Sequence, residues 1–207
     1  VVDEINSSGS QAIAAECDVT DATQVKHAVA ATLDAFGGID FQFNSAGSAM
    51  RRSPFLEIDE ELWDRAFDLN AKSVFTCMQA VLPHMLDRGD GVIVNVASMS
   101  VKRGGPGTSV HYAAAKGAVT TMTMGVAREF ANQGIRCLSI SPGPIDTAFQ
   151  AASATSPEIM QKFKDDVPMK RFGKPEEIAE LVLFLCSDAC TFMTADTIYV
   201  NGGGGWR

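Results

Sequence analysis

The chain has 207 residues, 46% of them hydrophobic, and its 17 basic and 25 acidic residues give a formal net charge of −8. That length suits one domain, and the hydrophobic fraction is large enough for a core, which excludes a disordered chain. No run of about 18 apolar residues is present, so no transmembrane helix is predicted. The acidic balance also argues against a surface that binds nucleic acid or an anionic membrane.

The first half of the chain predicts two strands and two helices. Ala12–Cys17 is typical of a short strand, and a capped helix over 20–36 follows it. Ile39–Phe43 is the second predicted strand. A long helical stretch over 59–86 comes next, and Pro83 predicts a kink or an early end in its last turns.

The second half predicts three more strands separated by helices. Its elements are, in chain order, a strand at Val92–Val96, a helix over 110–132, a strand at Ile135–Ile140, a short helix after Pro157, a helix over 174–187 and a strand at Thr197–Val200. Short strands that alternate with helices are typical of βαβ units and a parallel sheet. The fold class is therefore α/β, a doubly wound Rossmann-type sheet between two layers of helices, in one domain over 1–207.

The cysteines predict the compartment rather than the chemistry. Five of them are scattered singly through apolar segments, with no framework spacing, which favours reduced thiols in a cytoplasmic protein. Cys186 and Cys190 lie four residues apart, but no His or further Cys nearby completes a metal site. We therefore expect neither a disulfide nor a bound metal.

Tyr112 and Lys116 carry the sharpest chemical signal. They lie four residues apart on a predicted helix, so their side chains share one face. A free tyrosine has a pKa of about 10, and a nearby ammonium group would lower the pKa of Tyr112 and make it a proton donor and acceptor. The alternative is an ordinary amphipathic pair with Lys116 in solvent, which this motif alone favours.

Several small or polar residues follow the predicted strands. Ser98 and the segment 44–47 would lie at the carboxyl edge of the sheet, where ligands bind in open α/β folds. There Ser98 could bind a substrate oxygen beside Tyr112, and the small residues would let a cofactor approach the backbone. Both could also be plain turns. Asn70 lies in mid-helix, where either a polar role or an exposed face would explain it.

As a set, these motifs resemble the short-chain dehydrogenases/reductases of the single-domain type. The matching elements are Asp18-Val19, Asn44-Ser45-Ala46-Gly47, Asn70, Ser98, Tyr112 with Lys116, Pro142-Gly143-Pro144-Ile145-Asp146-Thr147, and Tyr199-Val200-Asn201-Gly202-Gly203. They occur in the order of the family, at about its spacing, over essentially the whole chain.

The resemblance implies a catalytic set of four residues. Tyr112 would be the general acid/base, and Lys116 would lower its pKa and bind the nicotinamide ribose. Ser98 would orient the reacting oxygen, and Asn70 would hold a water in a proton relay that reaches Lys116. Ser98 lies fourteen residues before Tyr112, one more than the commonest spacing in the family, so Ser100 stays a rival for its role.

The resemblance also implies NAD or NADP as the cofactor and hydride transfer between an alcohol and a ketone or aldehyde. Asp18 and Val19 would contact its adenine end. Besides Tyr112 and Lys116, the residues that would hold the rest of the cofactor are Asn44, Ala46 and Gly47 at the ribose and cleft, and Pro142, Gly143, Ile145 and Thr147 at the nicotinamide. The partners would be a small-molecule alcohol or carbonyl substrate and further copies of the chain, in a homodimer or homotetramer with Trp206 near one interface.

The segment Ala148–Phe172 would form a lid over the substrate. Its apolar residues, Phe149, Met160, Phe163 and Met169, favour a substrate with some hydrophobic body. The two strands and the glycine-rich turn that open the family's fold have no counterpart in the sequence, so we expect a sheet without them. This makes the alternative function a non-catalytic or inactive truncated protein of the same fold, with impaired cofactor binding.

Overall fold

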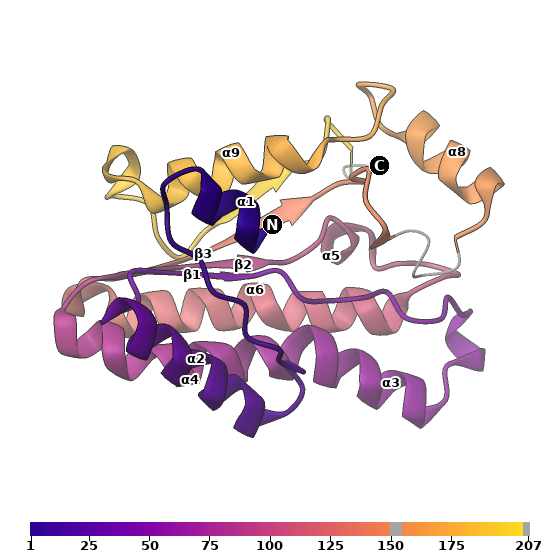
Figure 1. The fold of residues 1–207 in the computed structure, drawn as a ribbon. Coiled ribbons are helices and arrows are strands. Elements are labelled where there is room, and N and C mark those ends of the chain that lie inside the picture. Colours follow the sequence, from indigo (N-terminus) through magenta and orange to yellow (C-terminus); the bar gives the residue numbers. More distant parts are fainter. Residues whose placement is uncertain (150–154, 205–207) are drawn as a thin grey trace.

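Parallel strands form the sheet of this protein, which a computed structural model describes at residues 1–149 and 155–204. Within these residues the four strands are β1 (Phe41–Asn44), β2 (Gly91–Val96), β3 (Ile135–Pro142) and β4 (Thr197–Val200), in the spatial order β1-β2-β3-β4. The register pairs Phe43 with Val94 and Val94 with Leu138. Because all neighbours are parallel, the carboxyl ends of the strands meet at one edge of the sheet (Figure 1).

Helices cover both faces of the sheet (Figure 1). One face packs against α2 (Ala22–Phe36), α4 (Ser73–Arg88) and α6 (Val110–Phe130), and the other packs against α9 (Pro175–Cys186). Successive strand residues point to opposite faces, so Ile93 joins the core on the α4 and α6 side while Val92 and Val94 join the core beneath α9. This arrangement confirms the predicted three-layer α/β/α fold class.

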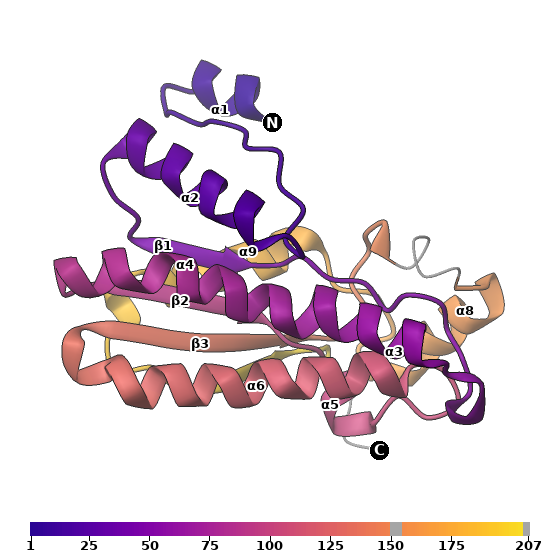
Figure 2. The same cartoon turned by 90° about the horizontal axis from the view of Figure 1, so that it is seen from below.

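The remaining elements are short and mostly peripheral. They are α1 (Val2–Ser7), η1 (Phe55–Glu57), α3 (Glu60–Phe67), η2 (Asp68–Lys72), α5 (Ser100–Arg103), η3 (Ala131–Gln133), α8 (Pro157–Asp166) and η4 (Asp188–Cys190). Figure 2 shows α1 set apart from the sheet, beyond α2, and α1 has no buried residue. No helix at residues 1–149 or 155–204 combines the length and apolar character that a membrane crossing needs. Trp206 lies outside the described residues.

The helix predicted over 20–36 forms because its ends are chemically marked. The side chain of Asp21 accepts hydrogen bonds from the backbone N–H groups of Thr23 and Gln24, which begins α2 at Ala22. Gly37 ends it with a φ of 75°, in the left-handed region that glycine adopts without strain.

The strand predicted at Ala12–Cys17 is wrong, since residues 10–18 form neither helix nor strand. Among the described residues β1 is the edge of the sheet and pairs with β2 alone, so Ala12–Cys17 joins no ladder. A strand is stable only where its backbone N–H and C=O groups pair with a neighbouring strand. The apolar pattern was therefore insufficient by itself to produce the strand.

The helix predicted over 59–86 is interrupted at a different place from the one expected. A π turn at Asp68–Lys72 separates α3 from α4, and α4 continues through Pro83 to Arg88. Pro83 is exposed, so water can hydrate the carbonyl group that loses its helical partner. At the π turn, the side-chain amide of Asn70 donates to the carbonyl oxygen of Ala66 and competes with the regular backbone ladder.

Candidate functional site

A cavity of about 750 Å³ opens at the carboxyl edge of the sheet. Its walls come from the loops that follow β1, β2 and β3, from the start of α6 and from α8. The predicted site residues that line it are Gly47, Ser98, Tyr112, Lys116, Pro142, Gly143, Ile145 and Thr147. Since the loops at this edge carry ligands in parallel α/β folds, the cavity is the candidate active site.

Tyr112 lies in the first turn of α6 and is only 9% exposed. The side chain of Ser98 lies close enough to this hydroxyl group to lower its pKa. The Oγ of Ser98 in turn accepts hydrogen bonds from Ser100, at 2.9 Å from its Oγ and 3.1 Å from its backbone nitrogen. Ser98 is therefore the serine that acts on the Tyr112 hydroxyl group, and Ser100 donates to Ser98.

Lys116 lies one turn further along α6 and is 2% exposed, which excludes the alternative that places it in solvent. Its Nζ donates a hydrogen bond of 2.7 Å to the carbonyl oxygen of Val96, at the end of β2. The same nitrogen lies 6.0 Å from the centroid of the Tyr112 ring. The shared helix face predicted from the sequence is thus present, and it faces the interior.

Lowering of the Tyr112 pKa by Lys116 stays a prediction, because burial dominates the pKa of Tyr112 in this arrangement. Burial raises the pKa of Tyr112 to about 12, and it outweighs the opposing effects of the Ser98 hydrogen bond and the charge of Arg52. Burial also lowers the pKa of Lys116 to about 8. The nearby charge that favours the phenolate is therefore that of Arg52, which the sequence did not single out.

Asn70 is fully buried at the π turn. This excludes the exposed face as the explanation for an asparagine in mid-helix and favours a polar role. Its Nδ2 donates to the carbonyl oxygens of Ser48 and Ala66 at 2.9 Å each, and its Oδ1 accepts from the Ser48 N–H at 3.0 Å. A Cβ on Gly47 would stand 2.8 Å from this Oδ1 and 3.1 Å from the Nζ of Lys116. Asn70 and Lys116 therefore flank one small space that only glycine leaves open.

Four of the predicted cofactor residues do not line the cavity. Asp18 is exposed, and its carboxylate accepts hydrogen bonds from Thr20 at 2.9 Å (backbone N–H) and 2.7 Å (hydroxyl). Val19 and Ala46 lie outside the lining as well. Asn44 is held within the sheet, where its Nδ2 donates to the Oδ1 of Asn95 at 2.8 Å.

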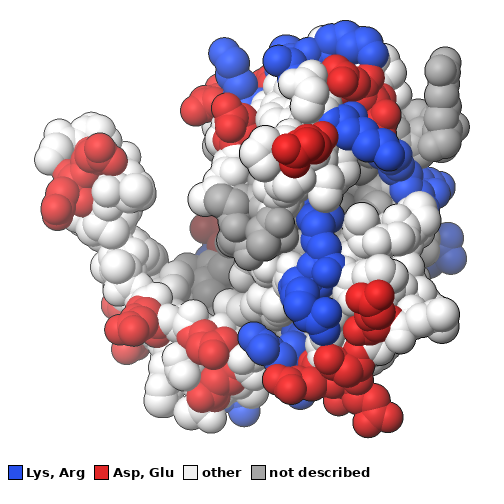
Figure 3. Space-filling view, turned by 90° about the vertical axis from the view of Figure 1, so that its right-hand side faces the viewer, with Lys and Arg blue, Asp and Glu red and all other residues white. Residues whose placement is uncertain are grey.

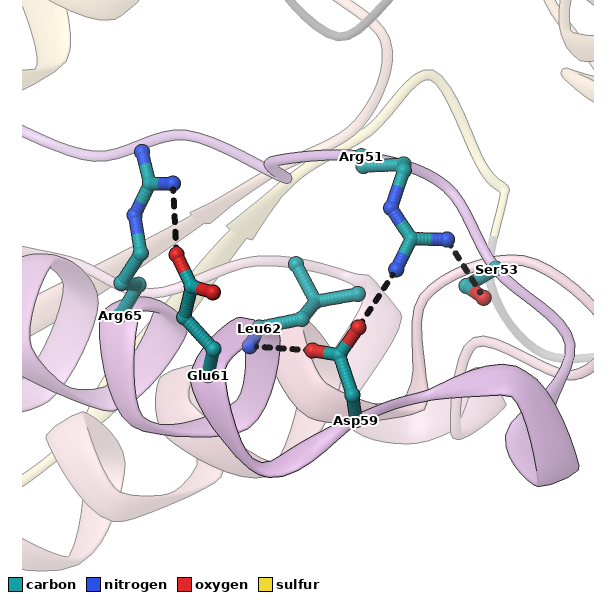
Figure 4. A network of polar contacts seen from close by, with 6 residues as sticks. All are labelled: Arg51, Ser53, Asp59, Glu61, Leu62 and Arg65. Carbon is teal, nitrogen blue, oxygen red and sulfur yellow. Dashed lines mark hydrogen bonds and ion pairs between the residues drawn. The ribbon is translucent and has the colours of Figure 1, made fainter.

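Two consecutive arginines after β1 have different surroundings. Arg51 is exposed and forms an ion pair of 3.2 Å with Asp59, the residue that caps α3 (Figure 4). Arg52 lines the cavity, where its Nε donates to the Oγ1 of Thr155 at 3.0 Å and its guanidinium lies 5.4 Å from the centroid of the Phe163 ring. Sequence reasoning missed Arg52; a charged pair in a loop at the ligand-binding edge was the available signal.

His111, which directly precedes Tyr112 in the sequence, is fully buried. Its Nε2 lies 3.1 Å from the carbonyl oxygen of Ala49, and burial lowers its pKa. Within residues 1–149 and 155–204, no group of three or more His, Cys, Asp and Glu side chains is placed to hold a metal ion.

The residues at the inner end of the cavity fit the nicotinamide end of a dinucleotide. Gly47 keeps a space open beside Lys116, and Pro142, Gly143 and Ile145 present small or apolar groups along the end of β3. A flat, partly apolar ring and its ribose hydroxyl groups suit such a surface, because it combines apolar contact with a buried ammonium group.

The fold and the site define a Rossmann-type protein with a ligand cavity at the carboxyl edge of its sheet, and residues 1–204 match a family model described as enoyl-(acyl carrier protein) reductase. The chain is 36% identical over 203 residues to the 3-oxoacyl-[acyl-carrier-protein] reductase FabG of Staphylococcus aureus, a match that covers 98% of this chain and 81% of the relative. It belongs to the short-chain dehydrogenase/reductase family, as its sequence predicted.

Solved structures agree with this assignment. A candidate short-chain dehydrogenase/reductase from Burkholderia xenovorans superposes with a TM-score of 0.89 at 32% identity, over 98% of this chain and 78% of that protein. NAD⁺-bound xylitol dehydrogenase gives a TM-score of 0.89 at 31% identity, over 98% of this chain and 83% of that protein. The named relatives are reductases and dehydrogenases, so the family is one of oxidoreductases, and the xylitol dehydrogenase structure contains bound NAD⁺.

Proposed function

We propose that this chain interconverts an alcohol with a ketone or aldehyde by hydride transfer to or from NAD or NADP. The observation that carries the proposal is the buried Tyr112 hydroxyl group in the wall of the cavity, with the side chain of Ser98 beside it in the same lining. A hydroxyl group that keeps its proton at neutral pH, beside a second hydroxyl group, suits the protonation of a substrate oxygen. The names of the relatives, an oxoacyl reductase and a xylitol dehydrogenase, support the same reaction class.

The cofactor supplies the hydride acceptor or donor when it is bound. Lys116 and Tyr112 would hold the nicotinamide ribose, and Gly47 leaves room for the ribose beside them. The residues that would hold the nicotinamide ring are Pro142, Gly143, Ile145 and Thr147, all in the lining. Asp18, Val19, Asn44 and Ala46 stay proposals for the adenosine end.

The proton chemistry follows from the surroundings of Tyr112. With a pKa raised to about 12 by burial, its hydroxyl group keeps its proton at neutral pH and can donate it to a substrate oxygen during reduction. Ser98 would hold that oxygen in reach, and the charge of Arg52 would stabilise the phenolate that remains. Asn70 and Lys116, which flank Gly47, would return a proton from solvent.

Replacement of Tyr112 by Phe tests this function. The Phe variant keeps the ring but lacks the acidic proton, so turnover of a carbonyl substrate should fall by at least about 100-fold. Affinity for NADH or NADPH, followed by fluorescence, should change little. Tyr199, on β4, is the other tyrosine of the chain, and Tyr199→Phe is the matched control that should keep its turnover.

Two outcomes would contradict the proposal. Turnover by Tyr112→Phe near the rate of the unmodified chain would remove Tyr112 from the acid/base role. Failure of the unmodified chain to bind either cofactor would instead support the alternative, a protein of the same fold without catalytic activity.

A further inference from the structure

His111 is a buried histidine to which the proposed function gives no role. It lies in the first turn of α6, directly before Tyr112, and its Nε2 is 3.1 Å from the carbonyl oxygen of Ala49. Its Nδ1 is buried as well and has no hydrogen-bond partner among the described residues. His27 and His84, the other two histidines of the chain, are exposed on α2 and α4. The protein rather than water therefore decides which nitrogen of His111 carries a proton.

These surroundings fix the tautomer of the His111 ring. A carbonyl oxygen can only accept, so Nε2 carries the proton and donates it to Ala49. A second N–H group at Nδ1 would be a buried donor without an acceptor. Burial lowers the pKa of His111 against the effect of the Ala49 hydrogen bond, and the charges of Arg51 and Arg52 act with burial. The face that carries α3 and α8 shows Lys and Arg side chains in a band (Figure 3), so a further positive charge is disfavoured at this end of the molecule.

The carbonyl group that His111 binds belongs to the loop over 45–53, which follows β1 and forms one wall of the cavity. Gly47 and Ala49 are among its lining residues. The loop contains no helix or strand. Met50 has a φ of 54°, in the left-handed region that strains a residue other than glycine. Such a conformation persists only where surrounding groups hold it, so the contacts of this loop determine its shape.

Contacts from several parts of the chain hold the loop. The backbone contacts are those of the Ser48 N–H with Asn70 Oδ1 at 3.0 Å, of the Ser48 carbonyl oxygen with Asn70 Nδ2 at 2.9 Å, and of the Ser53 N–H with the Thr108 carbonyl oxygen at 2.8 Å. On the solvent side Arg51 pairs with Asp59 (Figure 4). Ala49 lies between these attachments, next to the strained residue, and His111 binds it from α6.

The same part of the loop borders the position proposed for the nicotinamide ribose. A Cβ on Gly47 would stand 3.1 Å from the Nζ of Lys116, so the backbone of the loop passes close to that ammonium group. His111, Tyr112 and Lys116 all belong to α6. The contact with Ala49 therefore ties the loop to the helix that carries the proposed acid/base, and it sets the width of the space beside Lys116.

We propose that His111 is a positioning residue whose Nε2–H group, by holding the Ala49 carbonyl oxygen, fixes the loop over 45–53 in the shape that the nicotinamide ribose needs. This inference rests on the proposed function and adds to it a residue that touches neither the substrate nor the reacting atoms. Its effect is on cofactor affinity. Tyr112 and Ser98 keep their own roles, so the chemical step itself changes little once the cofactor is bound.

Two substitutions of similar volume separate the hydrogen bond from the packing. Gln places an amide N–H group near the position of Nε2, whereas Leu supplies no donor. We expect His111→Leu to weaken the binding of NADH or NADPH, followed by fluorescence, by about tenfold and to raise the KM for the cofactor equally, because the buried Ala49 carbonyl group loses its donor. Its kcat should stay within about twofold. His111→Gln should restore the affinity, and His84→Leu, at an exposed position on α4, is the matched control.

NMR spectroscopy tests the contact without any cofactor. Nitrogen–proton correlation across the imidazole ring of His111 should show a proton on Nε2 and none on Nδ1 at neutral pH. Amide hydrogen exchange over 45–53 should be faster in His111→Leu than in the unmodified chain and unchanged in His111→Gln. A role in packing alone would instead make the two variants alike.

The outcomes distinguish this inference from the proposed function. If the unmodified chain binds neither cofactor, but exchange over 45–53 speeds up in His111→Leu and not in His111→Gln, the proposed function fails and His111 still positions the loop. If the cofactor binds to His111→Leu as tightly as to the unmodified chain, the proposed function stands and the inference is overturned. A proton on Nδ1 in place of Nε2 also overturns it. Should His111→Leu fail to fold, weakened cofactor binding or faster loop exchange in His111→Gln overturns the inference, and unchanged values support it.

Discussion

The two walls of the cavity are built in different ways. The wall made by the strand ends and α6 carries Tyr112 and Lys116, which are 9% and 2% exposed, in contact with the core. The opposite wall is α8, which has no buried residue and is held by Arg52 through Thr155 and Phe163, and by the pair between Arg103 and Asp166. The groups proposed for the chemistry are thus fixed by the core, whereas α8 lies at the surface and is held by the side-chain contacts just named.

The largest expected effect distinguishes two serines of the core wall. Ser98→Ala should lower kcat/KM by about 100-fold, because Ser98 contacts the Tyr112 hydroxyl group and would hold the reacting oxygen. Ser100→Ala should cause a much smaller loss, since Ser100 only donates to Ser98. Steady-state kinetics of both variants measures the difference. Equal losses would show that the two serines act as a unit and that the contact with Tyr112 does not single out Ser98.

A stability effect of intermediate size should come from Lys116 on the same wall. Its pKa is lowered to about 8 by burial, so the folded chain carries a cost for the charged form at neutral pH. Lys116→Met should therefore stabilise the fold, by about 3 kcal/mol at most and less after the loss of the hydrogen bond to Val96. The same variant should lack turnover.

The pH dependence of this gain has a definite sign. Between about pH 8 and the unfolded pKa of 10.5, the unfolded chain binds more protons at Lys116, so the stability of the unmodified chain rises there. The stability gained by Lys116→Met should therefore have its full size below about pH 8. It should disappear as the pH rises from about 8 to 10.5. Urea unfolding at several pH values measures it, and Lys72→Met, at an exposed position paired with Asp68, is the control.

The smallest expected effect is at α8, the second wall of the cavity. The ion pair between Arg103 and Asp166 is about one-third exposed on both sides, and such pairs contribute roughly 0.2–1 kcal/mol. Arg103→Gln should therefore change global stability little but speed limited proteolysis near α8. High salt screens the ion pair, so it should speed proteolysis of the unmodified chain and remove its difference from the variant. Arg65→Gln, at an exposed pair on α3, is the control. A large loss of global stability in Arg103→Gln would show that α8 folds as part of the core.

Elements with local chemical markers were predictable from the sequence. The capped helix that begins after Asp21 and the strands β2, β3 and β4 have their signals within a few residues. Ala12–Cys17 failed because a strand depends on a neighbour, which no local pattern records. The π turn was missed although Asn70 in mid-helix was the visible sign of it.

The candidate site was predictable where motif and geometry coincide. Ser98, Tyr112 and Lys116 meet as the spacing suggested, whereas Asp18 and Asn44 lie away from the cavity. The pair of arginines in the loop after β1 was a weak signal for Arg52, because its orientation depends on contacts with Thr155 and Phe163, about one hundred residues further along the chain. The homodimer or homotetramer stays a prediction.

The π turn has a consequence for the geometry of the whole helical segment. Five of the buried side chains along it are spaced every four residues, at Leu62, Ala66, Asn70, Val74 and Met78. On a regular α-helix each such step rotates the stripe by about 40°, so five positions would wind well away from the core. One wider turn takes up part of that rotation in a single place. The π turn therefore rotates the residues of α4 back toward the core. At its position the side-chain amide of Asn70, rather than an aliphatic group, lies beside the backbone of Gly47.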